Sequence, residues 1–219
     1  MTYSTANKLA VIFDYNGTMV FDYEINKQAW LKLAEKLGKL DSFNYEQLNG
    51  LNNVKTLEVM TGSDDLEYLR SLSEEKEVIY RSIARKSSEY KLVPGLEDLL
   101  TELKENKIPC KIATASIKAN VDFYYSYLRL NRWFEREDIV YDTGEYPSKA
   151  AMIKEAVKRA NVSLNDCVIF DDSLVALRSI KDLGVKKIYA LNPKGIDIEK
   201  EKLADRVIRD YTGITLDQL

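Results

Sequence analysis

Two groups of aspartates in this 219-residue chain each follow a short apolar segment. Asp14 comes directly after residues 9–13, and the pair Asp171–Asp172 comes after residues 167–170. Apolar runs of this length are typical of buried strands, and open α/β folds place their chemistry where such strands end. Because adjacent carboxylates repel each other, we expect a cation between this pair and Asp14. Carboxylates, water and substrate phosphate together suit Mg²⁺, which is the cofactor we predict.

Both groups also have a purely structural interpretation. An aspartate before an Asn-Gly turn, as Asp14 is before Asn16–Gly17, commonly stabilises that turn. Asp171 and Asp172 could instead cap a helix over residues 173–183, where a negative charge also interacts favourably with the helix dipole.

Further candidate residues lie at the ends of two other predicted elements. Thr114, Ala115 and Ser116 come after the apolar segment 109–113, and Lys149 precedes a helical pattern over residues 150–160. Hydroxyl groups at a strand end could bind an anion, or could cap a helix that begins near Lys118. One lysine among 32 Lys and Arg residues is a weak signal by itself.

The composition excludes several classes of site and partner. The chain has no histidine, which rules out Ser-His-Asp and Cys-His triads and any His-ligated metal. A net charge of -3 and a pI near 5.3 argue against nucleic acid or an anionic membrane as partner. We find neither an apolar stretch of about 20 residues nor a signal peptide. Cys110 and Cys167 lie in predicted strands, where free thiols are more common than a disulfide or a metal pair, so we expect a cytoplasmic protein.

Apolar strands and amphipathic helices alternate along most of the chain. This alternation predicts an α/β fold with a doubly wound, mostly parallel, Rossmann-like sheet. The predicted strands cover residues 9–13, 109–113, 139–141, 167–170, 187–191 and 206–208. The predicted helices cover residues 96–106, 118–130, 149–160, 173–183 and 198–203.

The segment between the first two predicted strands is too long for a simple crossover. It shows helical periodicity, as at Ile25, Ala29 and Leu33, and a second long helix is predicted over residues 75–90. We therefore expect an inserted all-helical cap at residues 21–91, with residues 1–20 and 92–219 forming the α/β core. The cap would act as a lid hinged near Val20 and Leu92. The alternative is a single domain with extra packed helices.

The ordered set of Asp14, Thr114, Lys149 and Asp171–Asp172 resembles the four motifs of the haloacid dehalogenase (HAD) superfamily. Motif order and the cap insertion place the resemblance in its β-phosphoglucomutase-like and phosphatase subgroup. The resemblance implies an aspartyl phosphate on Asp14 and a small phosphorylated metabolite as substrate. It assigns the phosphoryl group to Thr114, Ala115, Ser116 and Lys149, with Thr114 favoured over Ser116. It assigns Mg²⁺ to Asp14, the backbone carbonyl of Asn16, Asp172 and Asp171, with Asp171 acting through water.

Asn16 departs from the family pattern, in which an aspartate at this position acts as general acid and base. Asparagine keeps the backbone carbonyl that would ligate the metal, because every residue has one. Its side-chain amide cannot shuttle protons, and loss of a general acid-base group typically lowers the rate about 10²–10⁴-fold. Three alternatives follow. The chain is a hydrolase that is slow or uses another acid, or it is a phosphonatase-like C–P hydrolase that uses a cap lysine such as Lys27, Lys32 or Lys55. The third alternative is a non-catalytic phosphate-binding or interaction protein. An engineered Asp-to-Asn substitution would give the same sequence. Neither the substrate nor the oligomeric state follows from these residues.

Overall fold

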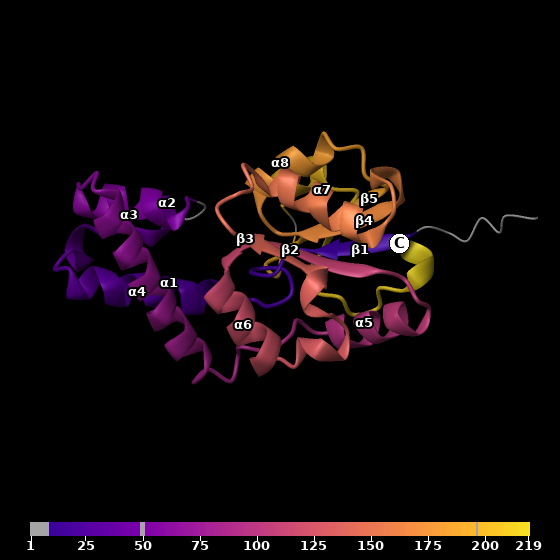
Figure 1. The fold of residues 1–219 in the computed structure, drawn as a ribbon, viewed down its shortest axis with the longest axis horizontal. Coiled ribbons are helices and arrows are strands. Elements are labelled where there is room, and N and C mark those ends of the chain that lie inside the picture. The colour runs from indigo at the N-terminus through magenta and orange to yellow at the C-terminus, as the bar shows by residue number, and fades with distance from the viewer. Residues whose placement is uncertain (1–8, 49–50, 196) are drawn as a thin grey trace, which may run out of the picture. The chain divides into compact units, whose positions relative to one another are not determined.

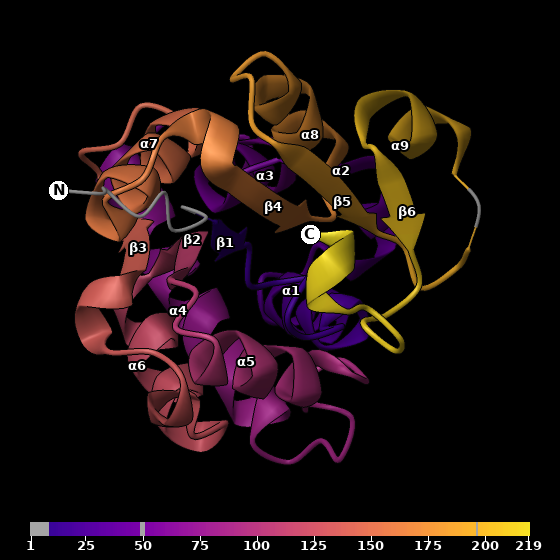
Figure 2. The ribbon, with the colours of Figure 1, turned by 90° about the vertical axis from the view of Figure 1, so that its right-hand side faces the viewer.

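Six parallel strands form one sheet in the order β3-β2-β1-β4-β5-β6. The computed structural model describes residues 9–48, 51–195 and 197–219. Strand order reverses at β1, with β2 on one side and β4 on the other, as Figure 2 shows. The predicted doubly wound fold is therefore confirmed, and its topological switch point lies between β1 and β4. The strands are β1 Ala10–Phe13, β2 Cys110–Ile117, β3 Ile139–Asp142, β4 Cys167–Asp171, β5 Lys187–Leu191 and β6 Arg206–Ile208.

Helices cover both faces of this sheet (Figure 1). Helices α7 (Lys149–Ala160), α8 (Leu174–Lys181) and α9 (Ile198–Leu203) lie on one face, and α5 (Leu96–Glu105) and α6 (Lys118–Tyr127) lie on the other. Side chains alternate between the faces, because successive residues of a strand point in opposite directions. Ala10 and Ile12 pack in the core beneath α7 and α8. Phe13 points to the other face, where it stacks on Phe170 with ring centroids 5.1 Å apart.

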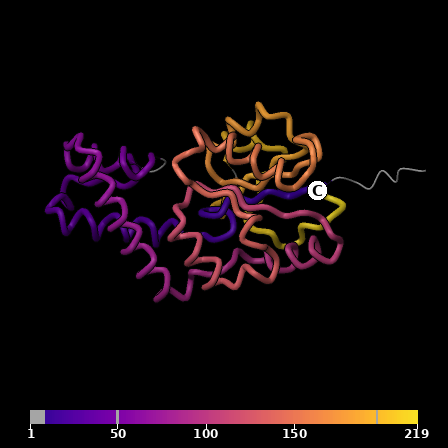
Figure 3. The backbone as a smooth tube through the Cα atoms, viewed as in Figure 1, coloured from indigo at the N-terminus to yellow at the C-terminus, as the bar shows by residue number. Residues whose placement is uncertain are grey.

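A second unit spans Asp22–Tyr90 and, over its described residues, is all-helical. The other unit runs to Phe21 and resumes at Lys91, and the course of the chain can be followed in Figure 3. The two connections pair with each other through an antiparallel bridge between Val20 and Leu92. The predicted helical insertion is confirmed. Its helices are α1 Tyr23–Lys36, η1 Leu40–Ser42, α2 Tyr45–Leu48, α3 Asn53–Thr61 and α4 Leu66–Ala84.

The largest differences from the predicted bounds occur in two elements. The helix predicted over residues 75–90 is wrong in its bounds, because α4 begins at Leu66, where Asp65 accepts hydrogen bonds from the amides of Glu67 and Tyr68. The strand predicted to end at residue 113 continues as β2 to Ile117, with a register shift against β3. Thr114 and Ser116 therefore lie within a strand. The predictions for residues 149–160, 187–191, 198–203 and 206–208 match the observed bounds.

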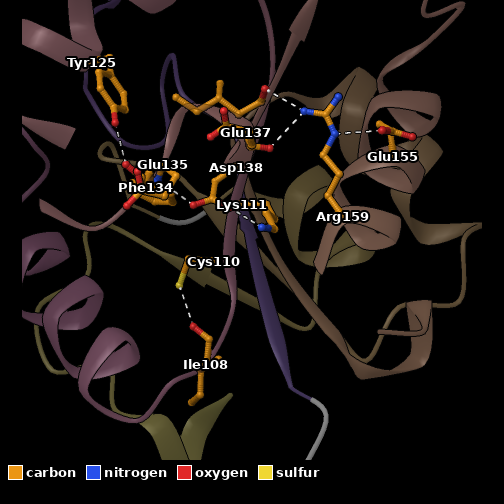
Figure 4. Close-up of polar contacts among 11 residues, drawn as sticks. Ile108, Cys110, Lys111, Tyr125, Phe134, Glu135, Glu137, Asp138, Glu155 and Arg159 are labelled. Atoms are coloured by element: carbon orange, nitrogen blue, oxygen red, sulfur yellow. Dashed lines mark hydrogen bonds and ion pairs between the residues drawn. The ribbon is translucent and has the colours of Figure 1, made fainter. Parts of the chain in front are cut away.

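Cys110 and Cys167 begin β2 and β4, and both are free thiols, as expected. Burial raises the pKa of the Cys110 thiol to about 12 and that of Cys167 to about 11. The Cys110 thiol donates to the Ile108 carbonyl at 3.5 Å (Figure 4). Among the helices of the described residues, none combines the length and apolar character required to cross a bilayer.

Candidate active site

The ends of β1 and β4 bring Asp14 beside Asp171. The two strands pair in register, with Phe13 opposite Phe170, and the Asp14 amide donates to the Phe170 carbonyl at 2.9 Å. One carboxylate oxygen from each of Asp14, Asp171 and Asp172 lies within 4.8 Å of the others. The structure therefore brings together the three aspartates singled out in the sequence, at the switch point of the sheet.

Lys149 reaches this group from the first residue of α7. Ser148 caps the helix by accepting a hydrogen bond from the Ala151 amide at 3.2 Å. The Lys149 Nζ donates to Asp14 Oδ1 and lies 3.2 Å from Asp171 Oδ2. Its side chain is 17% exposed, and those of Asp14 and Asp171 are 12% and 1% exposed. One partly buried ammonium therefore contacts two carboxylates, of which Asp171 is buried and Asp14 is partly buried.

Burial and the neighbouring charges shift the pKa values of these groups. Burial raises the pKa of Asp14 to about 6, with a further rise from Asp171 and an opposing effect from Lys149. Burial alone would lower the pKa of Lys149, but Asp14 and Asp171 outweigh it, and the net pKa lies above the ordinary value. Near neutral pH, Lys149 is therefore charged and Asp14 is largely ionised, as a nucleophilic carboxylate must be.

The turn after β1 is shaped around Asp172. Gly17 has a φ of +73°, and a Cβ added there would lie 2.3 Å from Asp172 Oδ2. Such a distance is far inside contact range, so only glycine allows this approach. The Thr18 hydroxyl donates to Asp172 Oδ1 at 3.3 Å. Sequence reasoning did not assign a role to Thr18, although it completes the Asn-Gly-Thr turn.

The alternative in which the acidic pair caps α8 is wrong. Ser173 is the N-cap of that helix and accepts a hydrogen bond from the Ala176 amide at 3.4 Å. Asp171 Oδ1 accepts from the Ser173 amide at 2.9 Å. Its buried Oδ2 accepts no hydrogen bond from the described residues and has the Lys149 ion pair as its neighbour. A buried carboxylate oxygen of this kind, beside two further carboxylates, fits the oxygen ligands of Mg²⁺.

Asn16 is held by the end of β2. The Ser116 hydroxyl donates to Asn16 Oδ1 at 2.7 Å across 100 residues of sequence. Thr114 is buried, and its Oγ1 accepts from the Ser116 amide at 3.2 Å, whereas Ala115 is exposed. The alternative in which Thr114 or Ser116 caps α6 is wrong, because Ile117 is the N-cap and no side chain caps that helix.

Of the three lysines of the helical unit considered for C–P hydrolysis, two have carboxylate partners within that unit. Lys27 lies 2.9 Å from Glu46, and Lys55 lies 2.5 Å from Glu58, whereas Lys32 is exposed. At Lys27 the hydrogen bond with Glu46 raises the pKa of the ammonium, which favours the protonated form over the neutral amine that a nucleophilic lysine needs.

Sequence reasoning missed Lys76. Its side chain is 4% exposed, with Nζ 3.0 Å from Glu77 Oε1 and 2.5 Å from Asn26 Oδ1. No sequence signal separates this lysine from the exposed lysines of the same unit.

The aromatic residues of α6 pack mainly into the core. Phe123 and Tyr124 are buried, and Tyr127 is exposed. The Tyr124 ring stacks on Tyr15, the residue between Asp14 and Asn16, with centroids 3.5 Å apart. The stacking of Tyr124 on Tyr15 therefore packs α6 against the turn after β1.

Comparison with known proteins gives one consistent result. A family model for haloacid dehalogenase-like hydrolases matches residues 9–184. The β-phosphoglucomutase of Bacillus subtilis is 27% identical, over 96% of this chain and 93% of that protein. The 6-phosphogluconate phosphatase of Escherichia coli is 26% identical, over 82% of this chain and 81% of that protein.

Solved structures agree with the sequence comparisons. A HAD hydrolase of family IA from Entamoeba histolytica superposes with a TM-score of 0.88 and 27% identity, over 96% of each chain. The β-phosphoglucomutase of Clostridium difficile superposes with a TM-score of 0.74 at 21% identity, which is evidence for the fold alone. With the family match, the chain belongs to the haloacid dehalogenase-like hydrolases.

Proposed function

We propose that this chain is a Mg²⁺-dependent phosphoryl-transfer enzyme of the phosphatase or phosphomutase type. Its substrate would be a small phosphorylated metabolite, and the reaction would pass through an aspartyl phosphate on Asp14. The observation that carries this proposal is the Lys149 ammonium between Asp14 and Asp171 at the switch point of the sheet. The mutase and phosphatase names of two relatives support the substrate class.

The proposed chemistry uses the residues in their observed positions. An Asp14 oxygen would form a bond to phosphorus while the bond from phosphorus to the leaving oxygen breaks. Lys149 would neutralise negative charge on Asp14 and on the phosphoryl oxygens. Thr114, Ser116 and the backbone amide of Ala115 would bind those oxygens at the end of β2. Water would then attack the phosphorus, the bond from phosphorus to the Asp14 oxygen would break, and inorganic phosphate would leave the regenerated carboxylate.

Asp14, Asp172 and the Asn16 carbonyl would hold Mg²⁺, with Asp171 acting through water. The bound ion would stabilise the charge of the transferred group. The glycine at position 17 supports this assignment, because it keeps the space that Asp172 occupies. Asp171 Oδ2 supports it too, as a buried acceptor that a metal-bound water would satisfy.

Asn16 should make the hydrolysis step slow. The Ser116 hydroxyl holds the side-chain oxygen Oδ1 of Asn16 as an acceptor, and a side-chain amide can neither donate a proton to the leaving group nor take one from water. This contact supports a second candidate function, in which the chain binds a phosphorylated ligand or keeps the phosphoryl group without turnover. We further propose that the helical insertion, taken as residues 21–91, is a lid whose closure excludes water from Asp14.

Hydrolysis of an aryl phosphate with Mg²⁺ separates the two candidates. We expect slow release of phosphate by the natural chain and a rate at least about tenfold higher for Asn16→Asp, because the substitution supplies an acid-base group. We also expect beryllium fluoride, a phosphoryl mimic, to bind both proteins in a Mg²⁺-dependent manner. Activity in Asn16→Asp alone would favour the non-catalytic candidate.

Two controls sharpen this test. Asp14→Ala in the Asn16→Asp background should abolish both hydrolysis and binding of the mimic. Peptide mass spectrometry should confirm that Asn16 is intact, because deamidation before Gly17 would itself produce an aspartate. If Asn16→Asp leaves the rate of an active enzyme unchanged, another residue is the acid-base group and the role assigned to position 16 is wrong.

A further inference from the structure

Tyr211 lies beneath the active-site end of the sheet and belongs to none of the four motifs. Its side chain is 1% exposed, and it comes three residues after β6. Its ring packs against Phe170 and Phe13, with centroids 5.2 Å and 6.1 Å away. Those two residues directly precede Asp171 and Asp14. The face of the sheet opposite to α7 is therefore braced by this ring at the two strands that carry the carboxylates.

The Tyr211 phenol continues this contact into the turn after β1. Its hydroxyl donates to the Thr18 carbonyl at 3.3 Å, and the Thr18 hydroxyl donates to Asp172 Oδ1 at 3.3 Å. Thr18 is fully buried, so the hydrogen bond to its carbonyl is shielded from water, and the hydrogen bond from its hydroxyl to Asp172 is partly buried. A chain of two hydrogen bonds thus leads from Tyr211 to Asp172.

The backbone of Tyr211 is fixed as well. Its amide donates to the Pro94 carbonyl at 3.0 Å. Gly95, with a φ of +78°, allows this approach, since an added Cβ would lie 2.5 Å from the Tyr211 carbonyl carbon. Burial raises the pKa of the phenol well above its ordinary value, and the charges of Asp14, Asp172 and Asp171 raise it further. Tyr211 is therefore a permanent hydrogen-bond donor near neutral pH.

We propose that Tyr211 is a positioning residue for the proposed Mg²⁺ site, which acts through Thr18 to hold Asp172 in place for the metal. The part of this inference that concerns Mg²⁺ rests on the proposed function. The part that concerns the order of the turn after β1 does not. The hydrogen bond from the phenol fixes the position of the Thr18 backbone carbonyl. The Thr18 hydroxyl in turn fixes the orientation of the Asp172 carboxylate. Without the phenol, the carboxylate should sample more positions and bind Mg²⁺ less tightly.

Tyr189 provides a matched control. Its side chain is also 1% exposed, and its ring also packs against Phe170, with centroids 4.7 Å apart. Its hydroxyl also donates to a backbone carbonyl, that of Gln218, at 2.6 Å. Gln218 belongs to the C-terminal segment, and its hydrogen bonds with side chains of the described residues go to Lys187, Tyr189 and Arg206 rather than to Asp14, Asp171 or Asp172. Tyr189→Phe and Tyr211→Phe therefore remove equivalent hydroxyls, and only the second leads to Asp172.

Calorimetric titration of the full chain with Mg²⁺ tests the inference. We expect Tyr211→Phe to weaken Mg²⁺ binding about three- to tenfold, as loss of one buried hydrogen bond would. Tyr189→Phe should change it by less than about twofold. In a double-mutant cycle with Thr18→Val, Tyr211→Phe should add little to the loss caused by Thr18→Val, because both break the same chain. Equal losses for Tyr211→Phe and Tyr189→Phe, or additive losses in the cycle, would overturn the inference.

A second measurement does not depend on the metal. In metal-free protein, hydrogen exchange at the Thr18 and Met19 amides should speed up in Tyr211→Phe and stay unchanged in Tyr189→Phe. If the natural chain binds no Mg²⁺, the metal part of the proposed function fails, and the exchange result still decides whether Tyr211 orders the turn. If Mg²⁺ binds and neither readout separates the two variants, Tyr211 is structural packing and the proposed function stands.

Discussion

Two charged clusters lie on the same sheet, and they differ in how their charges are satisfied. The carboxyl-edge cluster consists of Asp14, Lys149, Asp171 and Asp172. The β3-entry cluster, shown in Figure 4, consists of Lys111, Glu135, Asp138, Glu155 and Arg159. The principal ion pairs are similarly shielded, with Lys149 and Asp14 17% and 12% exposed, and Lys111 and Asp138 13% and 20% exposed. Burial alone therefore does not separate a candidate site from a structural one.

The two clusters differ in whether their buried polar atoms all have hydrogen-bond partners. In the β3-entry cluster, Asp138 uses both oxygens, one on Lys111 and one on the Glu135 amide at 2.7 Å. Arg159 pairs with Glu155 at 2.9 Å and donates to backbone carbonyls at the start of β3. In the carboxyl-edge cluster, Lys149 is shared between two carboxylates, and Asp171 keeps a buried oxygen without a hydrogen bond. The oxygens of Asp138 in the first cluster are satisfied within the fold, whereas the second cluster keeps a buried carboxylate oxygen that the proposed Mg²⁺ site would use.

The largest expected difference between the clusters concerns removal of the lysine. Lys149→Met leaves Asp14 and Asp171 facing each other without their ammonium, and we expect the free energy of unfolding to fall by about 3–5 kcal/mol in metal-free protein. Lys111→Met leaves one carboxylate that still accepts from a backbone amide, so about 1–2 kcal/mol is expected. Urea unfolding measures both values. Saturating Mg²⁺ should restore part of the loss in Lys149→Met alone, and equal losses without such rescue would contradict the comparison.

The fold and the motif positions could be predicted from this sequence for clear physical reasons. The apolar segments before Asp14 and Asp171 are fully buried strands, and buried parallel strands appear in sequence as continuous apolar runs. Helix α7 begins after Ser148 and ends at Asn161, residues with strong cap preferences. These local signals were sufficient for the sheet, for the helical insertion and for the position of each motif.

Contacts between distant segments could not be predicted in the same way. The Ser116–Asn16 hydrogen bond spans 100 residues, and the Tyr211–Thr18 hydrogen bond spans 193. Neither leaves a periodic pattern, because each depends on the register of strands and on one side-chain rotamer. The strand β2 was predicted too short for a related reason: Thr, Ala and Ser suggest a strand end, yet pairing with β3 resumes at Ile117 after a register shift. Tertiary pairing decided that boundary over local preference.

The two clusters should respond to pH in opposite directions. The folded-state pKa of Asp14 is raised from 3.8 to about 6, so the native state binds more protons between those values. Stability from this group is fully present below about pH 4 and is lost as pH rises through about 6, by at most about 3 kcal/mol. The pKa of Glu155 is lowered, first by its hydrogen bond with Arg159, so its contribution is lost instead as pH falls.

Unfolding of metal-free variants across pH isolates these contributions. Asp14→Asn should gain stability relative to the natural chain as pH rises from about 4 to about 6. Glu155→Gln should lose stability relative to the natural chain as pH rises through the ordinary range of a glutamate near 4.5. Parallel pH curves for Asp14→Asn and the natural chain would show that Asp14 is not shifted.

Metal addition provides the next difference. At about 100 times its dissociation constant, Mg²⁺ should stabilise the natural chain by about 2.7 kcal/mol. Asp172→Ala should lose this gain, whereas Asp138→Ala should be less stable without metal and keep the gain. Thermal melts with and without Mg²⁺ measure it, and calorimetry checks the affinity directly. Retention of the full Mg²⁺ gain in Asp172→Ala would remove that residue from the metal site.

The smallest expected difference in stability is between substitutions at two glycines with similar backbone φ angles. Gly17 and Gly184 have φ values of +73° and +69°, but a Cβ would meet Asp172 at Gly17 and nothing within 4 Å at Gly184. Gly184→Ala should therefore cost only the backbone penalty, about 1 kcal/mol. Gly17→Ala should cost about 2 kcal/mol, because it also displaces the carboxylate, and should weaken Mg²⁺ binding while Gly184→Ala does not. Equal stability losses and unchanged Mg²⁺ affinity in both variants would mean that Asp172 can move aside, and that its close approach to Gly17 is not needed for the metal.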